Sequence, residues 1–302
     1  MTTELAKKSS AKPTAYIFGA GTAGKQAYRN LRDNYEVLGF CDNDESKHHS
    51  VIDGVPVYSP TQLSTSPAEY VFIASEFFEQ IRSQLIEQYG IPADSLSHLP
   101  ARLLASKRFE RDIESIGLSL SMLNACCQIL KEFNLFHHID AGTLLGLYRD
   151  QSLIPWDDDM DIAVDSEGVN KINDNLERFT QCLESLTSER WRADVCYADK
   201  SFGNVPLRAI RSFKFVCTVA DRFPSIDFFV KYRSEEFSDY CLASRAIRMP
   251  AEYTKSTSTF HCAGFHWPIP QNTHAYLTYH YGNWETPDPN WSLQDLNNTV
   301  TF

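Results

Sequence analysis

The amino-acid sequence predicts an α/β protein with two domains, residues 13–100 and residues 107–302, the second ending in an irregular tail. Three observations lead to this prediction. The chain has 302 residues, which is more than one typical domain needs. From Thr14 onward, short apolar runs alternate with stretches of helical spacing, a pattern that favours parallel strands joined by crossover helices. This alternation stops near the prolines between residues 92 and 100, and a second one begins at Leu135.

The first domain follows a polar stretch, residues 1–12, which we expect to be flexible. An Asp-Gly pair at residues 53–54 marks a turn within it. The expected strands are Ala15–Phe18, Val37–Cys41, Val55–Tyr58 and Tyr70–Ala74, and the expected helices are Ala23–Arg32 and Glu79–Tyr89.

A glycine turn between the first strand and the first helix fits the pattern G-x-G-x-x-G, with Gly19, Gly21 and Gly24. In this context glycines let the backbone approach a phosphate at the positive end of the helix. Asp42 ends the second strand, where such folds place a ribose-binding acid. The sequence therefore predicts a Rossmann-like domain. Two interpretations of the glycines stay open: they bind a ligand, or they only permit a tight turn.

The first domain also resembles the N-terminal domains of PglD-like sugar acyltransferases. The resemblance spans residues 13–98 and is carried by the glycine turn, by Gly-Phe-Cys-Asp at residues 39–42 and by Gly-Val-Pro-Val at residues 54–57. It implies a nucleotide or nucleotide-sugar ligand rather than redox chemistry.

In the second domain, residues 107–133 carry apolar side chains at three- and four-residue steps, as a helix packed on a core does. From Phe260 the chain is rich in Pro, Trp, Tyr and Asn, which indicates the irregular tail. The expected strands are Met160–Val164, Arg192–Tyr197, Leu207–Ser212 with Lys214–Ala220, and Ile226–Lys231, and the expected helices are Thr143–Arg149 and Gly168–Leu186.

Four aspartates occupy five positions between residues 157 and 161, directly before the apolar run Ile162–Val164. Such a group does not fill a core, because a buried carboxylate needs a partner. Alternate residues of a strand share a face, so Asp157, Asp159 and Asp161 are expected to point one way. Carboxylates spaced in this manner can hold a hard cation such as Mg²⁺. The alternative is a solvated acidic turn, and the flanking motifs decide against it.

Upstream, the small-residue turn at 140–146 leads into a helix. Its backbone N–H groups, at Gly142 and beyond, and the Thr143 hydroxyl suit phosphate oxygens, and Arg149 offers a fork of donors for a diphosphate. Downstream, Asp227 lies in an apolar strand, where a metal would give its carboxylate a partner. A phosphate turn, paired carboxylates and a later single carboxylate are the layout of a nucleotidyltransferase-type site. Arg208, Arg211 and Lys214 either contact donor phosphates or form a solvated strand face.

These motifs resemble the LicD/fukutin-related phosphotransferase family. The resemblance covers residues 115–291 and is carried by G-T-L-L-G at 142–146, Arg149, I-P-W-D-D-D-M-D at 154–161, S-I-D-F-F at 225–229 and a signature of aromatic residues, glycines and prolines from Phe260 to Pro287. The family's glycine-rich link before I-P-W is replaced here by D-Q-S-L, so the loop on the donor side departs from the family pattern.

The resemblance implies a nucleotidyltransferase fold that transfers a phosphoryl-linked group, such as phosphocholine or ribitol phosphate. The donor would be CDP-linked, the acceptor a sugar hydroxyl of a cell-surface glycan or glycolipid, and the released product CMP. Asp159 and Asp161 would hold Mg²⁺ (or Mn²⁺), and Asp227 would complete the metal site and accept the proton of the acceptor hydroxyl. Two alternatives stay open: transfer of the nucleotide with release of pyrophosphate, and a non-catalytic nucleotide-binding scaffold in polysaccharide assembly.

Composition argues against some classes of binding partner and favours one cellular compartment. The net charge of −11 argues against a general affinity for nucleic acid or anionic lipid. The eight cysteines form no C-x-x-C pair or zinc-type spacing, so we expect free thiols in a reducing cytoplasm. We expect no signal peptide and no transmembrane segment. A cytoplasmic enzyme of this kind is compatible with peripheral association with the glycan assembly machinery.

Overall fold

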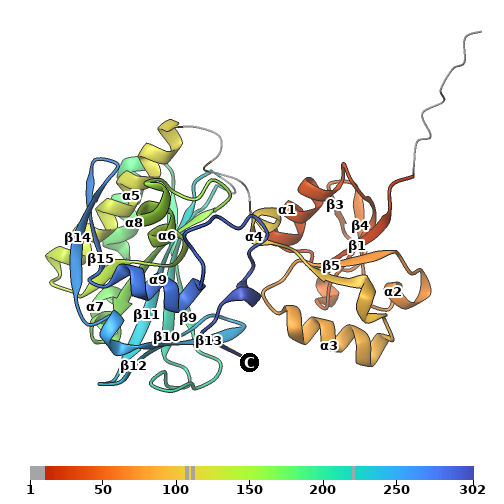
Figure 1. The fold of residues 1–302 in the computed structure, drawn as a ribbon. Helices are drawn as coiled ribbons and strands as arrows, with labels where there is room; N and C mark the ends of the chain where they lie inside the picture. The colour runs from red at the N-terminus through yellow and green to blue at the C-terminus, as the bar shows by residue number, and fades with distance from the viewer. Residues whose placement is uncertain (1–10, 106–108, 110–112, 220–221) are drawn as a thin grey trace, which may run out of the picture. The chain divides into compact units, whose positions relative to one another are not determined.

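The computed structural model describes residues 11–105, 109, 113–219 and 222–302. It separates into two compact units between Leu104 and Ala105 (Figure 1). Each unit has its own sheet with helices packed on it, so the predicted α/β fold class is confirmed. Most of the polar stretch 1–12, and the start of the helix expected from residue 107, lie outside the described residues.

The first unit contains β1 (Thr14–Phe18), α1 (Thr22–Leu31), β2 (Glu36–Cys41), β3 (Val51–Ile52), β4 (Val55–Tyr58), α2 (Gln62–Thr65), β5 (Tyr70–Ile73), α3 (Phe78–Tyr89), β6 (Leu96–His98) and α4 (Ala101–Leu104). Its strands lie in the order β3-β4-β2-β1-β5-β6, and every neighbouring pair except β3–β4 is parallel. Ile17 of β1 packs in one cluster with Leu31 of α1, and Phe18 packs in another with Leu85 of α3. Helices therefore cover both faces of the sheet, as expected for a Rossmann-like fold.

The second unit contains α5 (Ile113–Glu132), β7 (His137–Ile139), α6 (Ala141–Asp150), β8 (Asp159–Asp165), α7 (Val169–Asn173), α8 (Leu176–Thr187), β9 (Trp191–Tyr197), β10 (Ile210–Cys217), β11 (Ser225–Arg233), β12 (Phe237–Cys241), β13 (Arg245–Pro250), β14 (Thr257–Cys262), β15 (Phe265–Pro270), α9 (Thr273–Tyr281) and β16 (Thr299–Thr301). Six strands follow the order β16-β13-β12-β11-β10-β9, and β8 joins β11 to β7. The strands β14 and β15 form a separate hairpin.

The strand β11 organises this sheet because it pairs with β8, β10 and β12. It runs parallel to β8, with Asp227 opposite Asp161, and antiparallel to β10, with Asp227 opposite Lys214. Ile162 of β8 and Phe228 of β11 lie in the main core with α5, α6 and α8. Burial of an apolar side chain of this size contributes about 1.5–3 kcal/mol, so the core fixes which face of each strand points inward. Asp161 and Asp227 each directly precede one of these core residues, so their side chains point to the opposite face of the sheet.

The C-terminal part, which we expected from its composition to be irregular, is more regular than that in the structure. It contains the hairpin β14–β15, the helix α9 and the strand β16. The hairpin turn is made by Ala263 and Gly264, both with positive φ (51° and 81°), which suits a tight two-residue connection. Pro268 and Pro270 are tolerated in β15 because this strand pairs with β14 alone. Among the described residues, no helix combines the length and the apolar character that crossing a membrane requires.

Two further expectations differ in detail from the structure. The helix expected over 168–186 is divided into α7 and α8 at Asp174 and Asn175, and the Asn175 side chain donates to the carbonyl of Lys171. The strand expected from Leu207 begins at Ile210, because Arg208 takes a positive φ of 65° in the preceding turn.

Candidate active site

Three carboxylates meet on the face of the sheet that does not carry the main core. Each of Asp159, Asp161 and Asp227 offers an oxygen, and these oxygens all lie within 4.8 Å of one another. Asp159 and Asp161 come from β8, and Asp227 comes from the neighbouring parallel strand β11. Asp161 is 5% exposed and Asp227 is 6% exposed. The register of the two strands thus holds Asp161 and Asp227 side by side, although they are 66 positions apart in the sequence.

A second group joins the first through Asp159. Oxygens of Asp157, Asp158 and Asp159 also lie within 4.8 Å of one another. The same alternation of faces would place Asp158 on the side opposite Asp159. It holds for Asp159 and Asp161 and fails for Asp158. The reason is that β8 begins at Asp159, so Asp157 and Asp158 precede the strand, and Asp157 closes a turn by donating its N–H to the carbonyl of Ile154.

The pKa values of these groups reflect burial first. Burial raises the pKa of Asp159, Asp161 and Asp227. Repulsion from neighbouring carboxylates raises the pKa of Asp161 further, whereas Lys214 partly offsets the effect of burial on the pKa of Asp227. A divalent cation among these oxygens would favour their ionised forms, because opposite charge stabilises a carboxylate.

Lys214 supplies a cation at the edge of this group. Its Nζ lies 2.9 Å from Oδ2 of Asp227, and the Lys214 side chain is 42% exposed. The other carboxylate oxygen of Asp227, Oδ1, is buried and has no hydrogen-bond partner among the described residues. An orphaned carboxylate oxygen beside two further carboxylates is the donor set expected of a hard cation site.

The first turn of α6 supports β8. The Asp161 N–H donates to Oγ1 of Thr143 at 2.8 Å, and the Asp140 N–H donates to the carbonyl of Asp161 at 3.0 Å. Thr143 is 1% exposed, so its hydroxyl holds the strand rather than facing solvent. Gly142 has no room for a Cβ, because the carboxylate of Asp157 lies against it. The predicted phosphate turn thus touches the carboxylate group directly.

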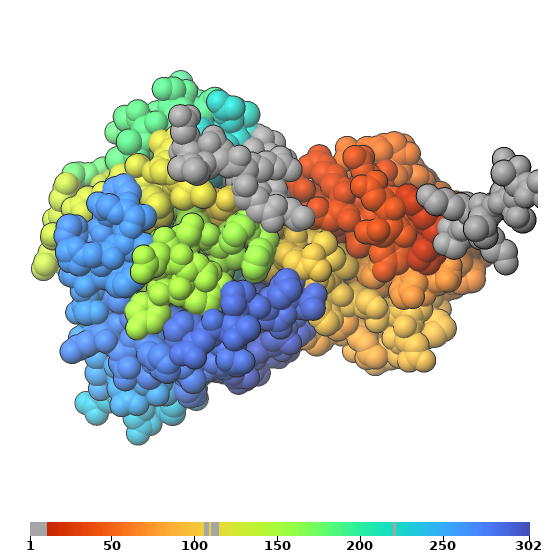
Figure 2. Space-filling view, turned by 45° about the horizontal axis from the view of Figure 1, so that its top comes forward, coloured from red at the N-terminus to blue at the C-terminus, as the bar shows by residue number. Residues whose placement is uncertain are grey.

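Arg149 lies at the other end of α6. Its guanidinium donates to the Asp150 carboxylate at 2.7–3.0 Å and to the Trp284 carbonyl at 3.1 Å. Tyr148 packs on the Trp284 ring, and the yellow-green surface around α6 borders the blue surface of the C-terminal residues (Figure 2). These contacts anchor the C-terminal segment, and a donor diphosphate would have to compete with Asp150 for Arg149.

Sequence reasoning missed a buried network beside the carboxylates. Lys231 Nζ lies 2.6 Å from Oδ2 of Asp140, and the Tyr276 hydroxyl donates to Oδ1 of Asp140. The His138 ring contacts Tyr276 edge-on, and burial lowers the pKa of His138 to about 4. One signal in the sequence could have revealed it: Lys231 lies in the apolar strand that carries Asp227, and a buried ammonium needs a partner of opposite charge because burying it alone is costly.

In the first unit the glycine turn has the expected shape. A Cβ at Gly24 would collide with the Gly19 carbonyl, whereas the space around Gly21 is open. Asp42 is used within the unit: Oδ2 accepts from Ala20 N–H at 2.7 Å and from Lys47 at 3.0 Å, and Oδ1 accepts a further N–H. A ribose contact at Asp42 would therefore have to replace Lys47, and ligand binding by the glycine turn stays a prediction.

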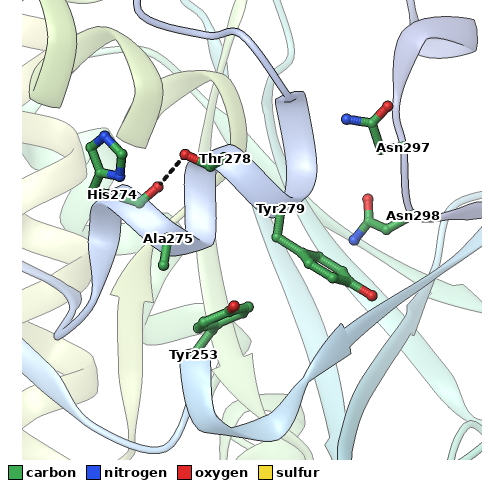
Figure 3. Close-up of a pocket in the computed structure, with 7 residues that line it drawn as sticks. All are labelled: Tyr253, His274, Ala275, Thr278, Tyr279, Asn297 and Asn298. Carbon is green, nitrogen blue, oxygen red and sulfur yellow. Dashed lines mark hydrogen bonds between the residues drawn. The ribbon is translucent and has the colours of Figure 1, made fainter.

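A surface groove of about 590 Å³ lies in the second unit along α9 (Figure 3). Its lining contains no carboxylate and none of the predicted site residues. The lining residues are Tyr253, His274, Ala275, Thr278, Tyr279, Asn297 and Asn298. The Asn298 amide is already bonded to His280 and to the Arg248 carbonyl. None of the lining residues belongs to β8 or β11, which carry Asp159, Asp161 and Asp227.

Comparison with known proteins gives low similarity at the level of whole chains. A curated relative, the uncharacterized protein RP689 of Rickettsia prowazekii (strain Madrid E), is 36% identical over 63 residues, which cover 21% of this chain and only 24% of the relative. Among solved structures, UDP-D-quinovosamine 4-dehydrogenase from Vibrio fischeri is 24% identical, with 30% of this chain and 77% of that chain covered and a TM-score of 0.24. UDP-N-acetylglucosamine 3-dehydrogenase GnnA from Acidithiobacillus ferrooxidans is 10% identical, with 86% and 83% covered and a TM-score of 0.26. These scores are too low to support an argument about ligand or activity.

Two family models match parts of the chain. Residues 12–96 match the model described as C2185-like, N-terminal, and the resemblance to PglD-like acyltransferases stays a prediction. Residues 134–272 match the model described as LicD/FKTN/FKRP, nucleotidyltransferase domain. The predicted similarity to the LicD family is thus supported for the segment that holds Asp159, Asp161 and Asp227.

Proposed function

We propose that the second unit is a divalent-cation-dependent transferase that moves a phosphoryl-linked group from a CDP-linked donor to a sugar hydroxyl of a glycan, releasing CMP. The observation that carries this proposal is the meeting of Asp159, Asp161 and Asp227 within 4.8 Å, on two strands held in register. The match of residues 134–272 to the LicD/FKTN/FKRP nucleotidyltransferase domain supports a transferase, with glycans as the class of acceptor.

The residues present fit Mg²⁺ or Mn²⁺. All three side chains offer carboxylate oxygens, which such cations prefer, and no thiol or imidazole belongs to the group. The buried Oδ1 of Asp227, which has no partner in the described part of the chain, gains one when a cation is held there. The cation would neutralise charge on the donor phosphates and on the leaving CMP.

The chain's own side chains supply the rest of the chemistry. The exposed part of Lys214 lets its ammonium turn from Asp227 towards a donor phosphate. Asp227 is the carboxylate to which we assign the proton of the acceptor hydroxyl, because it lies on β11 beside the pair Asp159 and Asp161 and its Oδ2 becomes free when Lys214 turns away. The turn at Gly142 presents backbone N–H groups at the start of α6, where phosphate oxygens are stabilised.

The test is substitution of the carboxylates one at a time. We expect Asp159→Asn, Asp161→Asn and Asp227→Asn each to lower kcat by a factor of at least about 10³ while the protein stays folded, because each removes a charge from the cation site. The assay incubates the protein with CDP-choline, CDP-ribitol or CDP-glycerol, a glycan acceptor mixture and MgCl₂, and measures CMP and pyrophosphate separately.

The matched control is Asp174→Asn, an exposed aspartate of the same unit outside the carboxylate group. It should keep wild-type turnover. Pyrophosphate in place of CMP would identify nucleotidyl transfer instead. Wild-type turnover by any of the three site variants would remove that residue from the mechanism.

A further inference from the structure

We propose that Lys231, Asp140 and Tyr276 form a buried positioning network that fixes the first turn of α6 against β8 and so sets the geometry of the carboxylate site. This inference rests on the proposed function, because it assigns the network to the site that holds the cation. It concerns three side chains that do not belong to the carboxylate group.

Both oxygens of the Asp140 carboxylate are engaged within the protein. Oδ2 lies 2.6 Å from the Lys231 ammonium, and Oδ1 accepts the Tyr276 hydroxyl. Asp140 is 1% exposed, Lys231 is 4% exposed and Tyr276 is fully buried. The ammonium also lies 3.1 Å from the centre of the Tyr240 ring. Residues of β11, α9 and the start of α6 are thus joined through one carboxylate.

An ion pair at this depth is poorly explained by stability alone. Removing two charges from water costs several kcal/mol per ion, and well-packed apolar residues of similar size often stabilise a protein as well or better. Asp140 is also the N-cap residue of α6, yet its side chain makes no capping hydrogen bond to its own helix. A carboxylate that gives up the usual cap interaction for a buried lysine departs from the local rule, and such departures are expected near functional sites.

The network acts on the site through Asp161. Both backbone polar groups of Asp161 are held by the turn that carries Asp140: its carbonyl accepts the Asp140 N–H, and its N–H donates to Thr143. On β11, Lys231 lies four residues after Asp227 and therefore on the same face of the strand. When Lys231 and Tyr276 hold the Asp140 side chain in place, they also hold the turn before α6 in place relative to β8 and β11, the two strands that carry the carboxylates.

The experiment removes the ion pair without changing the net charge near the site. In the variant Asp140→Asn/Lys231→Met, one negative and one positive charge disappear together, so their opposite effects on the cation largely cancel and the change in cation affinity reports mainly the geometry of the site. We expect the full-length variant to fold, to bind Mn²⁺ about tenfold more weakly by titration calorimetry, and to lose about 10–100-fold in kcat, as partners that orient ligands from outside the coordination sphere do. The KM for the donor should change by less than about threefold, because the side chains that contact the donor are intact.

The matched control is a second buried carboxylate of the same unit. Asp239 is fully buried and pairs with Arg248 at 2.8 Å, and neither residue belongs to the carboxylate group. The variant Asp239→Asn/Arg248→Met should lower the thermal midpoint and keep the Mn²⁺ affinity and kcat of the wild type. An equal fall in Mn²⁺ affinity in both double variants would overturn the inference, since it would show a general loss of rigidity.

A milder variant covers the case in which the double variant does not fold. Tyr276→Phe keeps both charges and removes one hydrogen bond, and we expect it to weaken Mn²⁺ binding by at least about threefold. Wild-type Mn²⁺ affinity and kcat in Tyr276→Phe, or in a folded double variant, would sink the inference while the proposed function stands. Weakened Mn²⁺ binding with no turnover of any CDP-linked donor by the wild type would contradict the proposed function and leave the network in place.

Discussion

At the scale of single residues, Lys214 has two opposing effects on the proposed site. It neutralises Asp227 at 2.9 Å, and its ammonium competes with any cation for the same carboxylate. The substitution Lys214→Met should therefore strengthen Mn²⁺ binding by about tenfold or less, the effect of one charge near a partly exposed site. It should also raise the KM for the donor, because a phosphate contact is lost. Titration calorimetry and steady-state kinetics on the same protein measure both changes.

The exposed Lys255 of the same unit gives the control, as Lys255→Met removes an equal charge away from the carboxylates. It should leave both quantities unchanged. If Lys214→Met weakened Mn²⁺ binding, Lys214 would be supporting the fold of the site rather than competing for it.

The sequence was informative about some residues and silent about others. Asp159, Asp161 and Asp227 could be singled out because charge in or beside an apolar strand is costly and needs a reason. Tyr276 could not be identified as a partner of Asp140, because it lies 136 positions away in the sequence and no periodic pattern links a helix to a turn across that distance. The engagement of Asp42 by Lys47 was equally invisible, since it depends on how the polar loop after β2 folds back.

At the scale of elements, α6 and the loop that follows it act together. Gly146 lies so close to this loop that a Cβ there would be 2.7 Å from the Ser152 carbonyl oxygen and 2.9 Å from the Ile154 nitrogen. Both neighbours are backbone atoms and cannot swing aside. Gly146→Ala should therefore destabilise the protein by about 1–3 kcal/mol and displace the loop that leads to Asp157. Denaturant unfolding and the transfer assay would show a joint loss of stability and kcat.

Gly117 provides the comparison within a helix. A Cβ at Gly117 of α5 would meet nothing within 4 Å, so Gly117→Ala should stabilise the protein by about 0.4–1 kcal/mol and leave kcat unchanged. Equal stability changes in Gly146→Ala and Gly117→Ala would show that the loop after α6 can move to accommodate a Cβ. The close approach at Gly146 would then not matter for the site.

Elements with a clear period were the ones that sequence reasoning could find. The strand β11 and the helix α6 were expected almost at their observed bounds, because apolar side chains repeat there with the step of a strand or a helix. The hairpin β14–β15 was missed because its prolines argue against a strand, and only the absence of a second neighbour makes them acceptable. Pairing of β8 with β11 is a fact of tertiary structure that local pattern does not contain.

At the scale of the whole molecule, the carboxylates link stability to pH. Burial raises the pKa of Asp159, Asp161 and Asp227 above the unfolded value, so the folded, cation-free protein holds these protons more tightly than the unfolded chain does. Stability from this source is complete below the ordinary aspartate range and is lost as pH rises through the raised pKa values. A bound cation opposes that loss, because it requires the ionised carboxylates.

We therefore expect MgCl₂ to raise the thermal midpoint by about 5–10 °C at about pH 8 and by much less at about pH 5, where protons compete for the same oxygens. Calorimetric scans with and without MgCl₂ at both pH values measure this difference. In Asp161→Asn, the gain in thermal midpoint from MgCl₂ should be small at both pH values. A gain from MgCl₂ that is equal at both pH values would mean that the cation binds elsewhere.

The parallel pairing of β8 with β11 has a consequence for biosynthesis. A ribosome makes Asp159 and Asp161 well before it makes Asp227, and the nascent chain cannot align them until β11 has left the exit tunnel and inserted between β8 and β10. The proposed cation site can therefore be completed only after β11 has been synthesised and paired. Until then Asp159 and Asp161 lack the third carboxylate of the proposed site.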